Sequence, residues 1–292
     1  MLERIDHIVA VVNDLEATAT RYEHLGLVLT PETRHAETGA ANRACFVGEA
    51  RNYAYLELLT VVDAEKAGRS GRKHYIDAME RGGGAVAIVF GVSDVEAISG
   101  RLHMRGYDAP VEHIHAVDGR KVCDAAQVDT GDALPFKVTL IQYPESWQDR
   151  YERSLAAGRF GHSFQLKRLD HLAAVAPNIE AATRFWEDIF EVPVAGEIQA
   201  GPMVIRQLRI GDAILELLGP SSPESPFAER PAALASMAAW EVSGRLEDAV
   251  AFARERGFSA SDPEPGVIPG TRRASIPAAE LGGVGMQLLE YV

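Results

Sequence analysis

The sequence predicts an α+β protein made of four βαβββ units, which form two similar halves. The first observation is an internal repeat, because residues 5–16 read IDHIVAVVNDLE and residues 169–180 read LDHLAAVAPNIE. The second is that one helix-like segment followed by three strand-like segments recurs four times. A repeat at this separation indicates a duplicated supersecondary unit. The identical positions are Asp6/Asp170, His7/His171, Ala10/Ala174, Val11/Val175 and Glu16/Glu180.

The length of the chain supports a division into two domains. It has 292 residues, and a domain averages roughly 150 residues. With 47% hydrophobic and 24% charged residues, the composition is that of an ordinary globular protein with enough apolar material for two cores. We expect a first domain over residues 1–148, a linker over residues 149–167 and a second domain over residues 168–292.

Charge and hydropathy exclude several classes of partner. The formal net charge is −13 and there is no Lys/Arg run, which argues against nucleic acid and anionic membranes, since both need a positive surface. A small anionic substrate remains compatible, because local charge can differ from net charge. No signal-like apolar run or stretch of about 20 apolar residues is present, so a cytoplasmic protein is expected. Cys45 and Cys123 lie in strand-like runs and are expected to be buried thiols.

The first unit opens with an apolar, β-branched strand at residues 4–12. Asn13 or Asp14 is a suitable N-cap for a helix at residues 15–25, and Gly26 is a suitable residue to end it. The polar stretch RHAETGAAN at residues 34–42 predicts a loop or hairpin. The other strands of this unit are expected at residues 27–29, 43–48 and 53–61.

The remaining units repeat this order. A helix at residues 73–81 and the break Gly82-Gly83-Gly84 precede the second unit, in which Ser93 is the expected N-cap. The linker is expected to contain a helix at residues 147–156. The second unit has predicted strands at 85–92, 110–116, 119–128 and 136–143 and a helix at 95–105. The third has strands at 169–176, 194–198, 204–210 and 213–218 and a helix at 179–190. The fourth has strands at 237–242, near 267–268, at 272–276 and at 284–291, and a helix at 246–256.

Strand alternation singles out a histidine and a glutamate in each half. His7 shares a strand face with apolar residues, and Glu57 in YLELL shares one with Tyr55 and Leu59. A carboxylate on such a face is costly unless it is paired or bound to a metal. His171 and Glu216 occupy the same places in the second half. The simpler interpretation is a hydrogen-bonded core histidine and a carboxylate paired with Arg or His.

This layout resembles the vicinal oxygen chelate superfamily, which includes glyoxalase I, bleomycin-resistance proteins, methylmalonyl-CoA epimerase and extradiol dioxygenases. The first half is similar to the glyoxalase-like domain in IDHIV, RHAETGAAN, YLELL and LPF, and the second to the glyoxalase/epimerase type in LDHLAAVAPNIEAATRFW and GVGMQLLEY. The resemblance implies two domains, each of paired βαβββ units around a small-molecule cleft. It also implies a divalent metal, with Zn, Ni, Mn, Fe and Co not distinguished.

In this superfamily the metal ligands come from the first and last strands of two paired units. The resemblance therefore implies that His7, Glu57, His171 and Glu216 are metal ligands, with the two glutamates also as catalytic residues. The chain departs from the pattern in the partner units. Ala87 and Met237 stand where His is expected, and the last strands offer Thr139 or Gln142 in the first half and Gln287 in the second.

Other polar residues are candidates for substrate binding. His35 and Asn42 lie in RHAETGAAN, which the resemblance places at the mouth of the cleft. His113 and His115 alternate in PVEHIHAV and so share a strand face, where they could act as acid and base. The simpler interpretation of these histidines is a solvated surface position. Trp186 and Trp240 are expected to pack in the core, and the sequence lacks the motifs of nucleotide cofactor sites and serine hydrolases.

Two classes of function remain open at this point. One is a glyoxalase-like lyase or isomerase whose weakly bound divalent metal polarises oxygens of a small substrate. The other is a metal-free protein that binds or sequesters a small aromatic or hydrophobic compound, as bleomycin-resistance proteins do. An extradiol-type dioxygenase is disfavoured, because its iron needs a face of two His and one carboxylate, and the second half keeps only His171 of these. Both unit pairs can form within one chain, so a monomer or a homodimer is expected.

Overall fold

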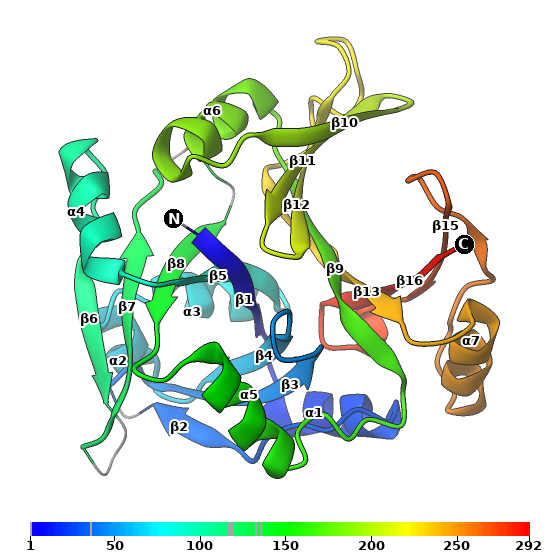
Figure 1. The fold of residues 1–292 in the computed structure, drawn as a ribbon, viewed down its shortest axis with the longest axis horizontal. Helices are drawn as coiled ribbons and strands as arrows, with labels where there is room; N and C mark the ends of the chain where they lie inside the picture. Colours follow the sequence, from blue (N-terminus) through cyan, green and yellow to red (C-terminus); the bar gives the residue numbers. More distant parts are fainter. Residues whose placement is uncertain (1, 36, 116–118, 132–133, 135) are drawn as a thin grey trace. The chain divides into compact units, whose positions relative to one another are not determined.

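A computed structural model describes residues 2–35, 37–115, 119–131, 134 and 136–292. It confirms the α+β class and the four βαβββ units (Figure 1). Ala36 of the predicted loop, Ala116 of a predicted strand and Pro135 of LPF lie outside the described residues. None of the helices in the described ranges is long and apolar enough to span a membrane.

The first half contains β1 (Leu2–Val11), α1 (Leu15–His24), β2 (Thr33–His35), β3 (Ala40–Val47), β4 (Ala54–Val61), α2 (Ala64–Arg69), α3 (Lys73–Glu80), β5 (Gly84–Val92), α4 (Val95–Met104), β6 (Val111–His115), β7 (Lys121–Val128) and β8 (Lys137–Gln142). After α5 (Trp147–Ala156), the second half contains β9 (Leu166–Val175), α6 (Ile179–Phe190), β10 (Val194–Ala200), β11 (Met203–Ile210), β12 (Ala213–Pro220), β13 (Ala233–Val242), α7 (Leu246–Glu255), β14 (Glu264–Pro265), β15 (Thr271–Ile276), the 3₁₀ turn η1 (Ala278–Glu280) and β16 (Gly285–Tyr291).

The strands form two eight-stranded sheets with the same topology. Their orders are β2-β3-β4-β1-β5-β8-β7-β6 and β10-β11-β12-β9-β13-β16-β15-β14. Within each unit the first strand pairs in parallel with the last strand, as β1 does with β4 and β9 does with β12. The identical order in both sheets follows from the internal repeat.

The chain packs into two compact bodies that do not coincide with the two halves of the sequence. The first body comprises Met1–Asp6, Ala87–Ser146 and His171–Ala235, and the second comprises His7–Val86, Trp147–Asp170 and Ser236–Val292. His7 and Glu57 therefore lie together in the second body, and His171 and Glu216 lie together in the first. The sequence-based domain limits at residues 148 and 168 stay a prediction.

Some predicted elements differ from those observed. The second strand of the first unit is β2 rather than residues 27–29, because Val28 N–H donates to the His162 ring in the linker and not to a neighbouring strand. Asn42, predicted in a loop, lies within β3. The helix α2, capped by the Asp63 side chain, was not predicted. Asp94 rather than Ser93 caps α4. In the fourth unit β14 precedes the predicted residues 267–268.

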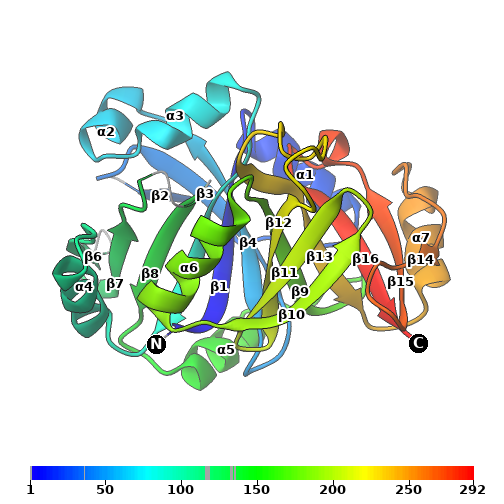
Figure 2. The ribbon, with the colours of Figure 1, turned by 90° about the horizontal axis from the view of Figure 1, so that it is seen from above.

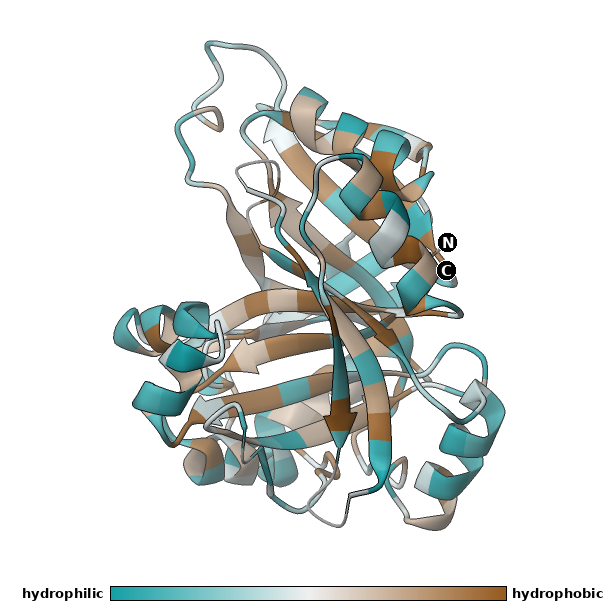
Figure 3. Cartoon of the chain, turned by 90° about the vertical axis from the view of Figure 1, so that its left-hand side faces the viewer, coloured by the Kyte–Doolittle hydropathy of each residue, from teal (hydrophilic) through white to brown (hydrophobic). Residues whose placement is uncertain are grey.

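Each sheet has one face covered by the helices of its units. α1 packs against β3 and β4 (Figure 1), and α6 packs against β12 (Figure 2). Apolar and polar residues alternate around the helices, while the strands are largely apolar (Figure 3). The core prediction for Trp186 and Trp240 is confirmed, since both are fully buried. Cys45 and Cys123 are also buried, and burial raises the pKa of Cys45 to about 12.

The duplication extends to hydrogen bonds and ion pairs. Arg43 on β3 pairs with Glu16 on α1, and Arg206 on β11 pairs with Glu180 on α6. The aspartates of the two DH pairs are also used alike. The Tyr143 hydroxyl donates to Asp6 and the Tyr291 hydroxyl donates to Asp170, at 3.0 and 2.7 Å. The repeated sequence positions thus preserve interactions between elements as well as an apolar pattern.

The linker is bound firmly to the first βαβββ unit. The predicted helix at residues 147–156 is confirmed as α5. The backbone N–H groups of Ser163 and Phe164 donate to the Gly26 carbonyl. A Cβ at Gly26 (φ +96°) would lie 2.5 Å from Ser163 Oγ, so this approach requires glycine. The His162 ring accepts from Val28 N–H through Nδ1 at 2.9 Å and donates from Nε2 to the Phe46 carbonyl at 2.6 Å.

Because of these two contacts, we expect protonation of His162 at low pH to destabilise the folded chain. Both ring nitrogens are engaged in the neutral form, and a proton on Nδ1 would face the Val28 N–H. Burial lowers the pKa of His162 from its ordinary value and outweighs the opposing hydrogen bond to Phe46. Because the unfolded chain then binds the proton more readily than the folded chain, the stabilisation is complete above about pH 6.5 and is lost as the pH falls below it.

We therefore expect the free energy of unfolding to fall when the pH is lowered from about 7.5 to about 5, and to fall less in His162→Gln. Urea denaturation at several pH values measures this. His103→Gln, at an exposed position on α4, is the matched control and should keep the wild-type pH dependence. Equal pH dependence in wild type and His162→Gln would contradict the assignment.

Candidate functional site

The first predicted His/Glu pair lies on the face of its strands that α1 does not cover. His7 on β1 and Glu57 on β4 have their Nε2 and Oε2 atoms 3.6 Å apart, with side chains only 7% and 12% exposed. The Asn42 amide on β3 donates a hydrogen bond to the other carboxylate oxygen, Oε1. His7, Glu57 and Asn42 form cluster 1. Each carboxylate oxygen of Glu57 therefore faces one nitrogen group.

The second half contains a matching arrangement, cluster 2. His171 Nε2 lies 3.8 Å from Glu216 Oε2, with side chains 10% and 8% exposed. The Gln207 amide on β11 donates to Glu216 Oε1 at 2.9 Å. The two clusters therefore have the same three groups in the same roles.

The amides of the two clusters come from different strand positions. Asn42 is in register with Leu59, two residues beyond Glu57 on β4. Gln207 lies directly opposite Glu216 on β12, the position that Ala44 holds opposite Glu57. The amide donor is thus retained although the residue that supplies it is not equivalent.

Strand register relates the four units at the predicted ligand positions. In each unit, the candidate ligand on the last strand is in register with the residue that follows the first-strand candidate by two positions. The pairs are Val9 with Glu57, Val89 with Thr139, Ala173 with Glu216 and Ala239 with Gln287. The corresponding first-strand residues are His7, Ala87, His171 and Met237.

This register shows that Gln142 does not occupy the predicted ligand position on its last strand, whereas Gln287 does. Thr139, not Gln142, occupies the last-strand position of the second unit. Gln142 shares its strand face with the fully buried Val138 and Leu140, and its Oε1 accepts from Val95 N–H at the start of α4, at 2.9 Å. Gln287 does occupy the equivalent position in the fourth unit.

Comparison with family models matches both halves of the chain. The model described as "Glyoxalase-like domain" matches residues 5–159. The chain belongs to the glyoxalase-like family. A second model, "Glyoxalase/Bleomycin resistance protein/Dioxygenase superfamily", matches residues 168–284. No curated protein matches this glyoxalase-like chain.

Several solved structures share the fold over nearly the whole chain. A hypothetical protein from Staphylococcus aureus is 13% identical with a TM-score of 0.65, covering 98% of both chains. A 4-hydroxymandelate synthase mutant from Streptomyces coelicolor is 17% identical with a TM-score of 0.65, covering 99% of this chain and 93% of that one. The Mn(II)-bound glyoxalase from Novosphingobium aromaticivorans is 12% identical with a TM-score of 0.64, covering 100% and 84%. At these identities the similarity establishes the fold alone.

The donor set of this glyoxalase-like chain does not fit a tightly held metal. Each cluster supplies one imidazole and one carboxylate, and the amide presents N–H to the carboxylate. The second and fourth units place Ala87, Thr139, Met237 and Gln287 at the corresponding positions. No group of three or more His, Cys, Asp or Glu residues in the described ranges is arranged to hold an ion. Stable sites use three or four protein ligands.

Aromatic rings adjoin cluster 1. The His7 ring stacks on Tyr55 at 4.2 Å between centroids, and Tyr55 stacks on Phe46 at 4.7 Å. Beyond Phe46 a further group of rings packs on the same face. They come from the residue before β4, from α5 and from the linker, and are Tyr53, Trp147, Tyr151 and Phe160. Cluster 2 has Ile214 in register with His171, where cluster 1 has Tyr55 with His7. The two clusters therefore differ in what surrounds them.

The other predicted substrate-binding residues are dispersed. His35 ends β2 and is partly exposed. His113 and His115 are exposed on β6 and are separated by a register shift. His113 Nδ1 lies 2.6 Å from Asp124 Oδ1, and the His115 ring contacts the His113 carbonyl. Asn42, which was predicted to bind substrate, donates to Glu57, and its role in substrate binding stays a prediction.

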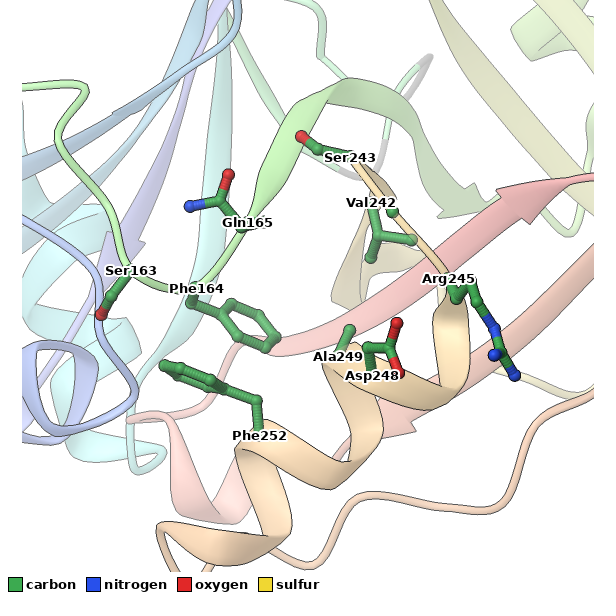
Figure 4. A pocket seen from close by; sticks show the side chains of 10 residues that line it. Ser163, Phe164, Gln165, Val242, Ser243, Arg245, Asp248, Ala249 and Phe252 are labelled. Carbon is green, nitrogen blue, oxygen red and sulfur yellow. The ribbon is translucent and has the colours of Figure 1, made fainter.

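A cavity of about 280 Å³ lies at the start of α7 (Figure 4). The rings of Phe164 and Phe252 lie side by side at one end, 5.8 Å apart, and the polar lining residues Ser243, Arg245 and Asp248 are exposed. None of the sequence-predicted site residues lines it.

Proposed function

We propose that this glyoxalase-like chain is an isomerase or lyase that transfers a proton on a small organic substrate, with Glu57 as the base. The observation that supports this most is the position of the Glu57 carboxylate. It is almost enclosed on a sheet face, with Asn42 bound to one oxygen and His7 beside the other. A base that is held in place and has little solvent to compete with the substrate is suited to proton abstraction.

The chemistry that cluster 1 can perform follows from its groups. Glu57 Oε2 takes the proton from a carbon next to a carbonyl group, and the electron pair moves to the carbonyl oxygen. The imidazole of His7 donates a hydrogen bond to that oxygen. Return of the proton to the same carbon, or to the former carbonyl carbon, completes an isomerisation. In an elimination the electron pair returns from the oxygen, a double bond forms between the deprotonated carbon and its other carbon neighbour, and the group on that neighbour leaves with the bonding electrons. Glu216 and His171 supply the same groups in cluster 2.

A second candidate is the binding or sequestration of a small aromatic compound without turnover. The stacked rings beside His7 favour it, because aromatic faces bind planar ligands by stacking. The donor set of the described residues favours it as well, because it does not complete a metal centre.

Deuterium exchange separates these two functions. The protein is incubated in D₂O with a panel of hydroxyketones, thioesters and ketoacids, and loss of the C–H signal is followed by NMR. Exchange that requires Glu57 or Glu216 supports the enzyme. Saturable binding of aromatic members without exchange of any member supports sequestration and contradicts the enzyme.

Metal content provides an independent check on the donor set. We expect elemental analysis of the purified protein to give well under one divalent ion per chain, because two protein donors compete poorly with water. Chelator treatment is expected to leave exchange unchanged. A stoichiometric ion that is lost in His7→Ala or His171→Ala would contradict this and place a metal in that cluster. His103→Ala serves as the control substitution.

A further inference from the structure

Arg159 in the linker lies at the end of the row of rings that begins at cluster 1. Its guanidinium carbon is 5.4 Å from the centroid of Phe46. Phe46 is stacked on Tyr55, which is stacked on His7. Phe46 and Tyr55 are in register on adjacent strands, as are Tyr55 and His7. The guanidinium therefore lies on the same sheet face as the proposed base.

The position of Arg159 is fixed by its neighbours in the chain. Phe160 packs edge-on against Phe46 at 6.0 Å, and His162 is hydrogen-bonded to the Phe46 carbonyl at 2.6 Å. Nη1 of Arg159 also donates to Ser154 Oγ at 3.4 Å. These contacts hold a half-buried cation against an aromatic face before any ligand binds, which limits the entropy that binding would cost.

Arg159 has no acidic partner in the part of the chain that the structure describes. Within the described residues no carboxylate forms an ion pair with it, whereas other partly buried arginines of this acidic chain, such as Arg43 and Arg206, are paired with glutamates. Burial lowers the pKa of Arg159 from its usual value, and the nearby charges of Arg153 and Arg150 lower it further. Guanidinium remains protonated at neutral pH, so the charge persists in unfavourable surroundings.

We propose that Arg159 forms a subsite for the anionic group of the substrate, a carboxylate or phosphate carried at the end of the molecule away from the carbon that faces Glu57. This inference rests on the proposed role of cluster 1 as the substrate site. It predicts an elongated anionic substrate, because the rings of Tyr55 and Phe46 separate Arg159 from His7. Guanidinium binds carboxylate and phosphate in a bidentate manner, and part-burial strengthens the contact.

Matched ligand pairs test the subsite by calorimetry. The pairs are biphenylcarboxylate with biphenylcarboxamide, phenylbutyrate with phenylbutyramide, and naphthyl phosphate with naphthol. We expect wild type to bind at least one anionic member about tenfold more tightly than its neutral partner. Arg159→Gln is expected to reduce that preference to about twofold or less, with the affinity for the neutral member unchanged. Comparison of the carboxylate and phosphate pairs identifies which anion is preferred.

Three further variants complete the test. Arg105→Gln changes the net charge equally at an exposed position after α4 and should keep the full preference. Arg159→Lys should retain part of it. Glu57→Gln should also keep it, so that failure of the proton-transfer proposal and failure of the subsite are distinguishable. The subsite is wrong if no anionic ligand is preferred by wild type, or if the preference survives in Arg159→Gln.

Discussion

Glu57→Gln is expected to lower the rate of substrate deuterium exchange by about 10²- to 10⁴-fold, the usual contribution of a positioned general base. Glutamine has nearly the shape of glutamate, and its Oε1 can still accept from the Asn42 amide. It cannot take up a proton from carbon. The fold should therefore be retained while the chemical step is lost, which the circular dichroism spectrum and the exchange rate report separately.

The same substitution in cluster 2 shows which half is active. If only cluster 1 reacts, Glu216→Gln should exchange at the wild-type rate, and if both react, only the double variant loses exchange. Glu65→Gln, at an exposed ion pair on α2, is the control for a change of charge. Wild-type exchange in the double variant would refute the role of both glutamates, whatever the state of the fold.

The non-equivalent amides support a role for the carboxylate beyond folding. If Glu57 and Glu216 were only remnants of the duplication without a function, any available hydrogen-bond donor could satisfy each carboxylate. The two halves would then not need matching donors. Instead both receive an amide N–H on Oε1 and have a histidine near Oε2. The amide is Asn42 in one half and Gln207, at a position two register pairs away, in the other. An amide supplies a hydrogen bond without a charge that would compete for the proton.

Much of the fold could be predicted from the sequence, because it depends on local patterns. The repeat around His7 and His171, the period-two strands and the polar caps before α1 and α6 each act within a few residues. The elements whose positions were predicted wrongly depend on contacts with residues far away in the sequence. Residues 27–29 look like a strand, yet Val28 bonds to His162 more than a hundred residues later, and no local signal contains that pairing.

The candidate site was predictable only in part for the same reason. Alternation places His7 and Glu57 on apolar faces, but strand register decides that Asn42 reaches Glu57. Register also decides that Thr139 occupies the position considered for Gln142. The burial of Val138 and Leu140 on the face of Gln142 is a signal that strand alternation could have used. Arg159 lies in a polar linker, where its sequence neighbours resemble those of any solvated arginine.

Arg168→Met is expected to destabilise the protein by about 3–5 kcal/mol, the cost of breaking a buried ion pair by removing one partner. Arg168 donates to Asp170 at 3.0 Å and to Glu241 at 2.6 Å. The Tyr291 hydroxyl donates to the same Asp170 oxygen at 2.7 Å, and Lys167 pairs with Glu241. The Asp170 side chain is 1% exposed, so solvent cannot replace the lost guanidinium.

The electrostatics of this network agree with a strong dependence on Arg168. Burial opposes the charge of Arg168, but the carboxylates of Asp170 and Glu241 outweigh it and hold its pKa above the usual value. Burial, together with the hydrogen bond to Asp170, raises the pKa of Tyr291 to about 12, so the hydroxyl remains a donor at neutral pH. The Tyr291 hydroxyl carries no charge that could neutralise the carboxylate of Asp170, and the ion pair of Lys167 is with Glu241.

Urea denaturation of Arg168→Met beside Arg273→Met measures the effect. Arg273 forms an exposed ion pair with Glu264, and its loss should cost less than about 1 kcal/mol. Methionine fills a similar length of side chain in both variants, so the difference between them isolates the buried charges. A loss in Arg168→Met no larger than that in Arg273→Met would mean that water reaches Asp170 and Glu241, and that the network contributes no more than a surface ion pair.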